Sequence, residues 1–114
     1  MRQDETPSQV ARVGSVYLLH FAEPYFHARH YVGFTRNVRR RLQQHRAGRG
    51  ARLMAAIAEE GISFVLARTW EEVTRAFERR VHRARANPRI CPLCAGARAI
   101  PLTPRRDPAT GLAR

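Results

Sequence analysis

Five residues have the side-chain types that phosphodiester chemistry needs, and their order along the chain is Tyr17, Tyr31, Arg41, His45 and Glu78. Tyrosine and histidine can position or activate water, arginine can stabilise negative charge on a phosphate, and a carboxylate can hold a divalent cation. The tyrosines stand in apolar runs, and Glu78 is the single acidic residue among six arginines between residues 75 and 89. This set indicates metal-assisted attack on a phosphodiester.

Each of these residues also has an ordinary structural explanation when it is considered alone. Tyrosine is common in β-strands as a packing residue. Glu78 adjoins an apolar stripe and is within helical reach of basic residues, with which an exposed ion pair would contribute at most about 0.5 kcal/mol. The candidate partners for that ion pair are Arg75, Arg79 and His82. It is the combination of five residues that favours a catalytic site.

The charge of the chain favours a polyanionic partner. All 21 basic residues are arginine, and the formal net charge is +12 over 114 residues. A GC-rich genome would explain arginine in place of lysine, but it would not explain the excess over acidic residues. Seven arginines and no acidic residue lie between residues 36 and 52, whereas a solvated helix face usually mixes both signs. We expect this surface to contact the phosphates of nucleic acid, with DNA favoured. The contacting residues would be Arg36, Arg39, Arg40, Arg46, Arg49 and Arg52.

Apolar and alternating segments predict the strands that position these residues. Residues 13–21 and 30–34 are rich in β-prone side chains, and they are close enough in sequence to pair as antiparallel neighbours. Such pairing would place Tyr17 and Tyr31 on adjacent strands. Residues 62–67 alternate and predict a third strand, while Gly33 in the second run indicates a close approach to the backbone.

Three helices are predicted around these strands. The first runs from about residue 37 to residue 47 and presents Arg41 and His45 one turn apart on the same face. The second covers about residues 51–60, and the third begins at a capping box over residues 69–72 and runs to about residue 85. The order β-β-α-α-β-α is typical of an α/β (α+β) domain with a small, mainly antiparallel three-stranded sheet.

Composition also suggests how the chain is divided. Residues 1–12 are expected to form a flexible arm, residues 13–90 the folded domain, and residues 91–114 a loose tail. Cys91 and Cys94 form a single C-x-x-C at the start of that tail. A structural zinc site needs four ligands, and no second cysteine pair exists, so zinc is not expected there. His82 or a partner chain could supply ligands, which leaves a zinc-stabilised protein-interaction domain as an alternative.

The sequence predicts no contact with membranes. No segment approaches the ~20 consecutive apolar residues of a membrane span. The first residues lack a basic segment followed by an apolar one. We therefore expect a cytoplasmic protein, whose oligomeric state the sequence does not indicate.

The order of these residues resembles the GIY-YIG nuclease superfamily, in the form of a small single-domain member. Gly14 followed by Val16-Tyr17-Leu18 is similar to the first signature, and Tyr31-Val32-Gly33 is similar to the second. Arg41 stands ten residues after Tyr31, where the family has its catalytic arginine, and His45 follows four residues later. Glu78 matches the family's metal-binding glutamate. The similarity covers residues 14–87.

The resemblance implies an endonuclease that hydrolyses nucleic acid with one Mg²⁺ or Mn²⁺ held by Glu78. It further implies that Tyr17, assisted by Tyr31 or His45, activates or positions the attacking water, and that nearby Arg41 and the metal favour the tyrosine phenolate. The departures from the family are Ser15-Val16 in place of glycine-isoleucine and a somewhat long connection between the tyrosines. The alternative is a basic module that keeps the fold and binds DNA or RNA without cutting it. A pure binder would have no need for a carboxylate beside a phosphate.

Overall fold

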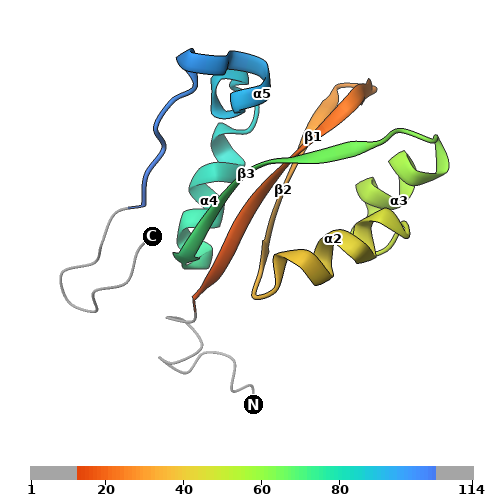
Figure 1. The fold of residues 1–114 in the computed structure, drawn as a ribbon, viewed down its shortest axis with the longest axis horizontal. Helices are drawn as coiled ribbons and strands as arrows, with labels where there is room; N and C mark the ends of the chain where they lie inside the picture. The colour runs from red at the N-terminus through yellow and green to blue at the C-terminus, as the bar shows by residue number, and fades with distance from the viewer. Residues whose placement is uncertain (1–12, 105–114) are drawn as a thin grey trace.

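The computed structural model describes residues 13–104, and a three-stranded antiparallel sheet forms its centre (Figure 1). Strand β1 (Gly14–Tyr25) lies between β2 (Ala28–Thr35) and β3 (Phe64–Val73). Tyr17 is opposite Gly33 on β2 and opposite Thr69 on β3. The pairing of the first two predicted strands is therefore confirmed, although both strands are longer than their apolar runs suggested.

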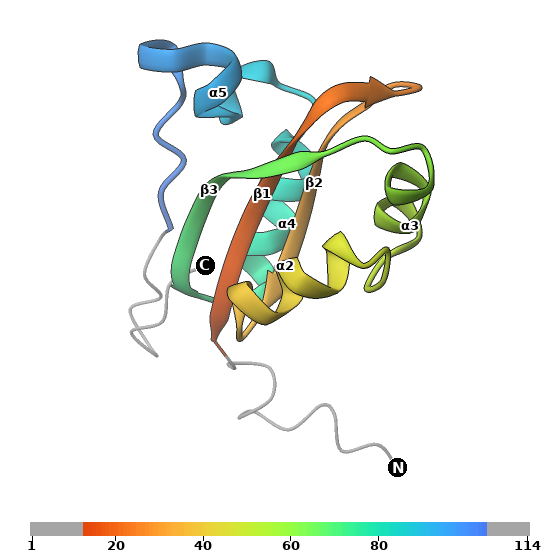
Figure 2. The same cartoon turned by 45° about the vertical axis from the view of Figure 1, so that its right-hand side comes forward.

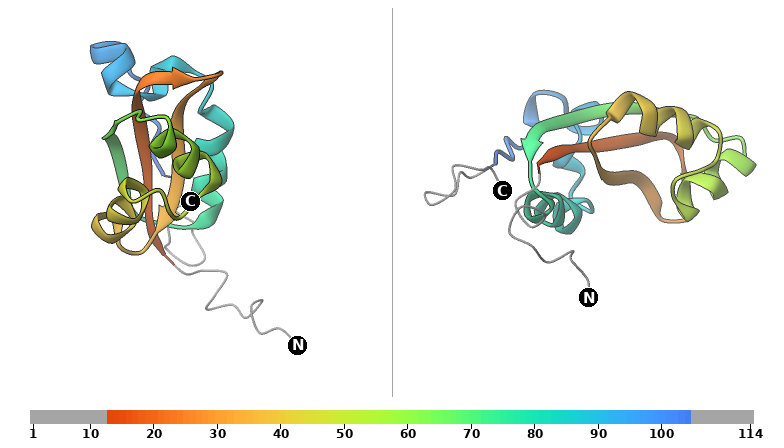
Figure 3. Two further views of the ribbon diagram at one scale, coloured as in Figure 1. Left: turned by 90° about the vertical axis from the view of Figure 1, so that its right-hand side faces the viewer. Right: turned by 90° about the horizontal axis from the view of Figure 1, so that it is seen from below.

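Helices cover both faces of this sheet. Helices α2 (Val38–Arg46) and α3 (Arg52–Glu59) lie on one face, and α4 (Arg75–Ala84) lies on the other (Figures 2 and 3). After α4 come the short helical turns η2 (Pro88–Ile90), α5 (Pro92–Ala95) and η3 (Gly96–Arg98). This mixed α/β architecture confirms the predicted fold class.

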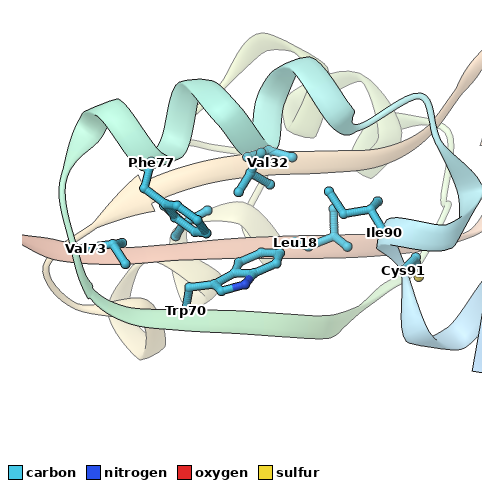
Figure 4. Packing of buried hydrophobic residues seen from close by; sticks show 9 residues of the cluster. Leu18, Val32, Trp70, Val73, Phe77, Ile90 and Cys91 are labelled. Atoms are coloured by element: carbon cyan, nitrogen blue, oxygen red, sulfur yellow. The ribbon is translucent and has the colours of Figure 1, made fainter. Parts of the chain in front are cut away.

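Strand β1 supplies both hydrophobic cores because its side chains alternate between the two faces. Tyr17, Leu19 and Phe21 are buried against α2 and α3, whereas Val16 and Leu18 are buried against α4. The core on the α4 side (Figure 4) is the larger of the two, and its buried members are Val16, Leu18, Val32, Trp70, Val73, Phe77, Val81, Ile90 and Cys91. A chain segment buried on both faces explains the continuous apolar run at residues 16–19.

The predicted start of the third helix at a capping box over residues 69–72 is wrong. These residues continue strand β3, and α4 begins only at Arg75 with Thr74 as its N-cap. Trp70 pairs with Val16 of β1, and its ring packs against Phe77 at a centroid distance of 5.6 Å. Pairing with the central strand and burial of the indole stabilise the strand more than a local capping interaction of about 1 kcal/mol would stabilise a helix.

Part of the segment that was expected to be loose contacts the sheet. The Arg68 guanidinium donates hydrogen bonds to the carbonyl oxygens of Ile90 and Ile100 at 3.3 and 2.9 Å. The Trp70 indole nitrogen donates to the carbonyl oxygen of Leu102 at 2.7 Å. The predicted arm at residues 1–12 and the end of the tail at residues 105–114 lie outside the described residues. Within the described part of the chain, no helix has the length and apolar character to cross a membrane.

Candidate active site

The two tyrosines and the histidine singled out in the sequence lie together on the α2 side of the sheet. Tyr17 comes from β1, Tyr31 from β2 and His45 from the last turn of α2. The ring centroids of Tyr17 and Tyr31 are 6.1 Å apart, and that of His45 is 5.8 Å from Tyr17 and 5.2 Å from Tyr31. Tyr17 and His45 are fully buried, whereas Tyr31 is half-buried and reaches the surface.

A chain of two hydrogen bonds determines the protonation of this cluster. The Nδ1 atom of His45 lies 3.0 Å from the carbonyl oxygen of Arg49, which can only accept, so Nδ1 carries the proton and donates it. The Nε2 atom of neutral His45 is then an acceptor. The Tyr17 hydroxyl lies 2.8 Å from this nitrogen and donates to it. Tyr17 is therefore protonated, and its hydroxyl donates to a buried, neutral imidazole.

The loop after α2 fits closely around His45. At Gly50, where φ is +96°, a Cβ atom would lie 3.0 Å from Cε1 of His45 and 3.1 Å from its Nδ1. The left-handed backbone and the missing side chain at this position allow the loop to bring the Arg49 carbonyl to the imidazole. A glycine just after a helix is usually only its end, so local sequence does not indicate this role.

The pKa values of the cluster describe a set of neutral groups. Burial raises the pKa of Tyr17 well above its ordinary value, and Tyr31 raises it further, whereas the charge of Arg41 lowers it by a smaller amount. Burial also raises the pKa of Tyr31. The pKa of His45 is lowered, first by burial and also by the charge of Arg41. The charge of Arg41 therefore acts in the expected direction, towards the Tyr17 phenolate, but desolvation of the buried ring outweighs it.

Arg41 and Glu78 lie beside the cluster from opposite sides of the sheet. Arg41 is half-buried on α2, and its charge acts on Tyr17, Tyr31 and His45. Glu78 is on α4, and its charge raises the pKa of Tyr31, so its carboxylate is within electrostatic range of the Tyr31 hydroxyl. The five candidate residues thus come from four elements, and Tyr31 interacts with each of the other four.

Glu78 also forms the ion pair that the sequence offered as an alternative explanation. Its Oε1 atom is 3.4 Å from Nη1 of Arg75, and the two side chains are 22% and 67% exposed respectively. An exposed pair of this kind contributes little to stability. The Glu78 side chain is partly exposed, and carboxylate oxygens are ligands that a hard divalent cation takes together with water and substrate phosphate.

The six arginines predicted to bind nucleic acid are all exposed. They lie in the turn before α2, on α2, in the loop after it and at the first residue of α3. Arg46 also lies over the Phe64 ring, with its guanidinium carbon 5.6 Å from the ring centroid. No acidic residue interrupts this surface between residues 36 and 52, so it presents one sign of charge next to the tyrosines.

Two further histidines, which the sequence left without a role, do not join this site. His20 and His30 are direct partners across the β1–β2 pairing, and they lie with Cys91 and Cys94 on the α4 side of the sheet. Asn87, the last residue of the segment that resembles the family, caps η2 by accepting a hydrogen bond from the Arg89 amide. The register of the β1–β2 pairing places residues 20 and 30 opposite each other, and this is the sequence signal that could have predicted their proximity.

Gly33→Ala is expected to destabilise the protein by about 1–3 kcal/mol, because an added Cβ would collide with the Tyr17 ring. This close packing is the backbone approach that Gly33 indicated. Urea unfolding of the parent and of the Gly33→Ala variant would measure the loss. In a Tyr17→Ala background the collision is absent, so the same substitution should cost much less. An equal cost in both backgrounds would contradict the packing role of Gly33.

Comparison with known proteins gives one match. The family model described as the GIY-YIG catalytic domain matches residues 14–87. The matched segment runs from the first residue of β1 to just beyond α4 and contains all five residues of the candidate site. No curated protein and no solved structure gives a significant match to the chain.

Proposed function

The chain belongs to the GIY-YIG catalytic domain family of nucleases, and from this premise we propose that it is a metal-dependent endonuclease acting on DNA. The observation that carries the proposal is the buried hydrogen bond from Tyr17 to neutral His45, with Tyr31 and Arg41 around it and Glu78 within electrostatic range. A packing tyrosine does not need a buried base as its partner. Tyrosine, histidine and arginine side chains in mutual contact are groups that water activation beside a phosphate would need.

The proposed proton path runs through this hydrogen bond. Because the pKa of Tyr17 is raised, a free phenolate would be a rare species at neutral pH. The Tyr17 oxygen can instead accept the proton of an attacking water while its own proton passes to Nε2 of His45. The Arg49 carbonyl holds His45 in the tautomer that leaves Nε2 free to receive it. Tyr31, half-buried beside both rings, would orient the water.

Arg41 and Glu78 would act on the phosphate. The Arg41 guanidinium would stabilise the charge that grows on the phosphate oxygens in the transition state. Glu78 would hold Mg²⁺ or Mn²⁺ as the one carboxylate of the site. When bound, such a cation neutralises charge on the scissile phosphate and the leaving oxygen. The Arg75–Glu78 ion pair would open when the cation takes its place.

Cleavage of supercoiled plasmid and of branched DNA in Mg²⁺ or Mn²⁺ tests the proposal. We expect nicking that EDTA abolishes. If neither DNA is cut while the protein binds both, structured RNA is the next substrate to assay. Binding without cleavage of any of these substrates would favour the alternative, a basic binding module on the same fold.

Arg39→Gln is expected to weaken DNA binding and to lower the slope of log affinity against log salt by about 0.9, the value for one phosphate contact on duplex DNA. Arg39 is exposed on α2, within the arginine surface. The matched control is Arg98→Gln, which removes the same charge from η3. Fluorescence anisotropy over a series of salt concentrations measures both slopes. Equal losses in the two variants would mean that net charge alone, and not this surface, determines binding.

A further inference from the structure

Four metal-ligating side chains meet on the face of the sheet opposite Tyr17 and His45. They are His20, His30, Cys91 and Cys94, and one donor atom from each lies within 4.8 Å of all the others. Both cysteines are free thiols. In the described part of the chain, this is the one group of three or more histidine, cysteine or acidic residues close enough to hold a metal ion.

The fold brings the four residues together from three segments. His20 and His30 are opposite each other in the antiparallel pairing of β1 and β2, which places their side chains on the same face. Cys91 is the N-cap of α5, and Cys94 follows one helical turn later, so both sulfurs lie on one side of that turn. Burial of Ile90 and Cys91 in the core, together with the hydrogen bond from Arg68 to the Ile90 carbonyl, holds the turn against the strands.

The distances between the donor atoms match the edges of a tetrahedron around one zinc ion. Nδ1 of His20 is 3.6 Å from each cysteine sulfur, Nε2 of His30 is 3.5 Å from the Cys94 sulfur, and the two nitrogens are 3.3 Å apart. Zn–S and Zn–N bonds of about 2.3 and 2.05 Å at tetrahedral angles give S···N edges of about 3.6 Å and an N···N edge of about 3.3 Å. The pair of histidines therefore has the spacing of ligands to a common ion.

The chemistry of the donors selects the metal. Two thiolates and two imidazoles in a tetrahedral arrangement favour zinc over hard cations such as Mg²⁺, which prefer oxygen ligands. A two-iron cluster would separate its ligand pairs much further than these atoms are separated. Four protein ligands leave no open position for water or substrate, which is the mark of a structural site.

We propose that His20, His30, Cys91 and Cys94 bind one structural zinc ion that fastens the C-terminal segment to the β1–β2 hairpin. This zinc site shares no residue with the proposed nuclease site, so the two proposals can be tested independently. A single C-x-x-C supplies only two of the four ligands that a structural zinc ion needs, and His20 and His30 supply the other two. His82, the ligand considered from the sequence, instead contacts Arg85 on α4.

In a domain this small, such an ion would stabilise the fold. A short chain buries a limited core, and metal binding adds folding free energy directly. The segment between residues 88 and 104 has little regular structure beyond three short helical turns. The zinc ion would link this segment to the two strands that carry Tyr17 and Tyr31 on their other face.

Metal analysis of the full chain tests the proposal. Protein purified without chelators should contain about one zinc ion per chain, and Cys94→Ser and His30→Gln should each reduce this content to below about one tenth. Cys94 is exposed, so its replacement does not disturb the core in the way that replacing buried Cys91 would. The matched control is His27→Gln, an exposed histidine of the same hairpin, which should keep its zinc.

A cobalt titration uses the parent chain alone, so its result does not depend on the folding of any variant. Cobalt titrated into the metal-free full chain should give the d–d bands of tetrahedral Co²⁺ and a thiolate-to-cobalt charge-transfer band. A chelator should lower the melting temperature of the parent and leave that of Cys94→Ser unchanged. Three results would overturn the proposal: a parent that contains no zinc and gives no tetrahedral cobalt spectrum, a Cys94→Ser variant that keeps full zinc content, or a disulfide between Cys91 and Cys94 in the purified protein.

Discussion

Glu78→Gln is expected to lower the rate of DNA cleavage by at least about 10²-fold while DNA affinity stays the same or rises. The amide keeps the shape of the side chain but removes the negative charge that the proposed cation requires. The same charge repels the DNA phosphates, so its loss does not weaken binding. Single-turnover cleavage of a plasmid in Mn²⁺ or Mg²⁺ gives the rate, and anisotropy without divalent cations gives the affinity.

Arg75→Gln is the matched control for this prediction. Arg75 is the partner of Glu78 in the ion pair, and its side chain is 67% exposed. If Glu78 serves only as one end of that pair, the two substitutions should have equally small effects, since an exposed pair is worth well under about 1 kcal/mol. If Glu78 holds the cation, Arg75→Gln should cleave at close to the parental rate. Full activity in Glu78→Gln would exclude the carboxylate from catalysis.

The residues of the candidate site that lie together could be proposed from the sequence because local patterns bring them close. Apolar runs predicted the two strands that carry Tyr17 and Tyr31, and helical spacing placed Arg41 and His45 on one face. Their assembly needs only the pairing of neighbouring strands and the packing of the next helix. Glu78 was within reach of prediction for a different reason, since it is the single carboxylate in an arginine-rich helix.

The zinc ligands could not be predicted in the same way because tertiary packing joins them. Cys91 and Cys94 are more than 60 residues from His20 and His30 in sequence, and no regular spacing connects the two pairs. Their meeting depends on the burial of Ile90 and on contacts from β3 to the C-terminal segment. The start of α4 was missed for a related reason, since the pairing of Trp70 with β1 overrides a local capping signal.

The protonation of the site was also beyond sequence reasoning. Charge alone suggested that Arg41 would favour a Tyr17 phenolate, but the extent of burial decides the sign of the pKa shift. The partner of the Tyr17 hydroxyl depends on the tautomer of His45, which a backbone carbonyl from the following loop determines. The sequence left the residue that assists Tyr17 open between Tyr31 and His45, and the buried hydrogen bond to His45 is the reason for proposing the Tyr17–His45 pair.

Arg41→Gln is expected to lower kcat by about 10²–10³-fold, with a much smaller change in KM. The half-buried guanidinium acts on charge that develops in the transition state, whereas the exposed arginines act on the ground-state phosphates. The matched control is the neighbouring Arg40→Gln, which should raise KM and leave kcat nearly unchanged. Arg41→Lys should recover part of the rate, because it restores the charge but not the planar pair of donors.

The pH dependence provides a second readout of Arg41. Cleavage needs unprotonated His45, so the rate should fall as the pH drops through the pKa of His45, which lies below the ordinary value of 6.5. The charge of Arg41 is one of the causes that lower this pKa, so Arg41→Gln should move the acidic limb of the profile to higher pH. If the kcat of Arg41→Gln is within about threefold of the parental value, Arg41 does not stabilise the transition state. If the acidic limb of the profile does not move in Arg41→Gln, the charge of Arg41 does not act on the protonation of His45.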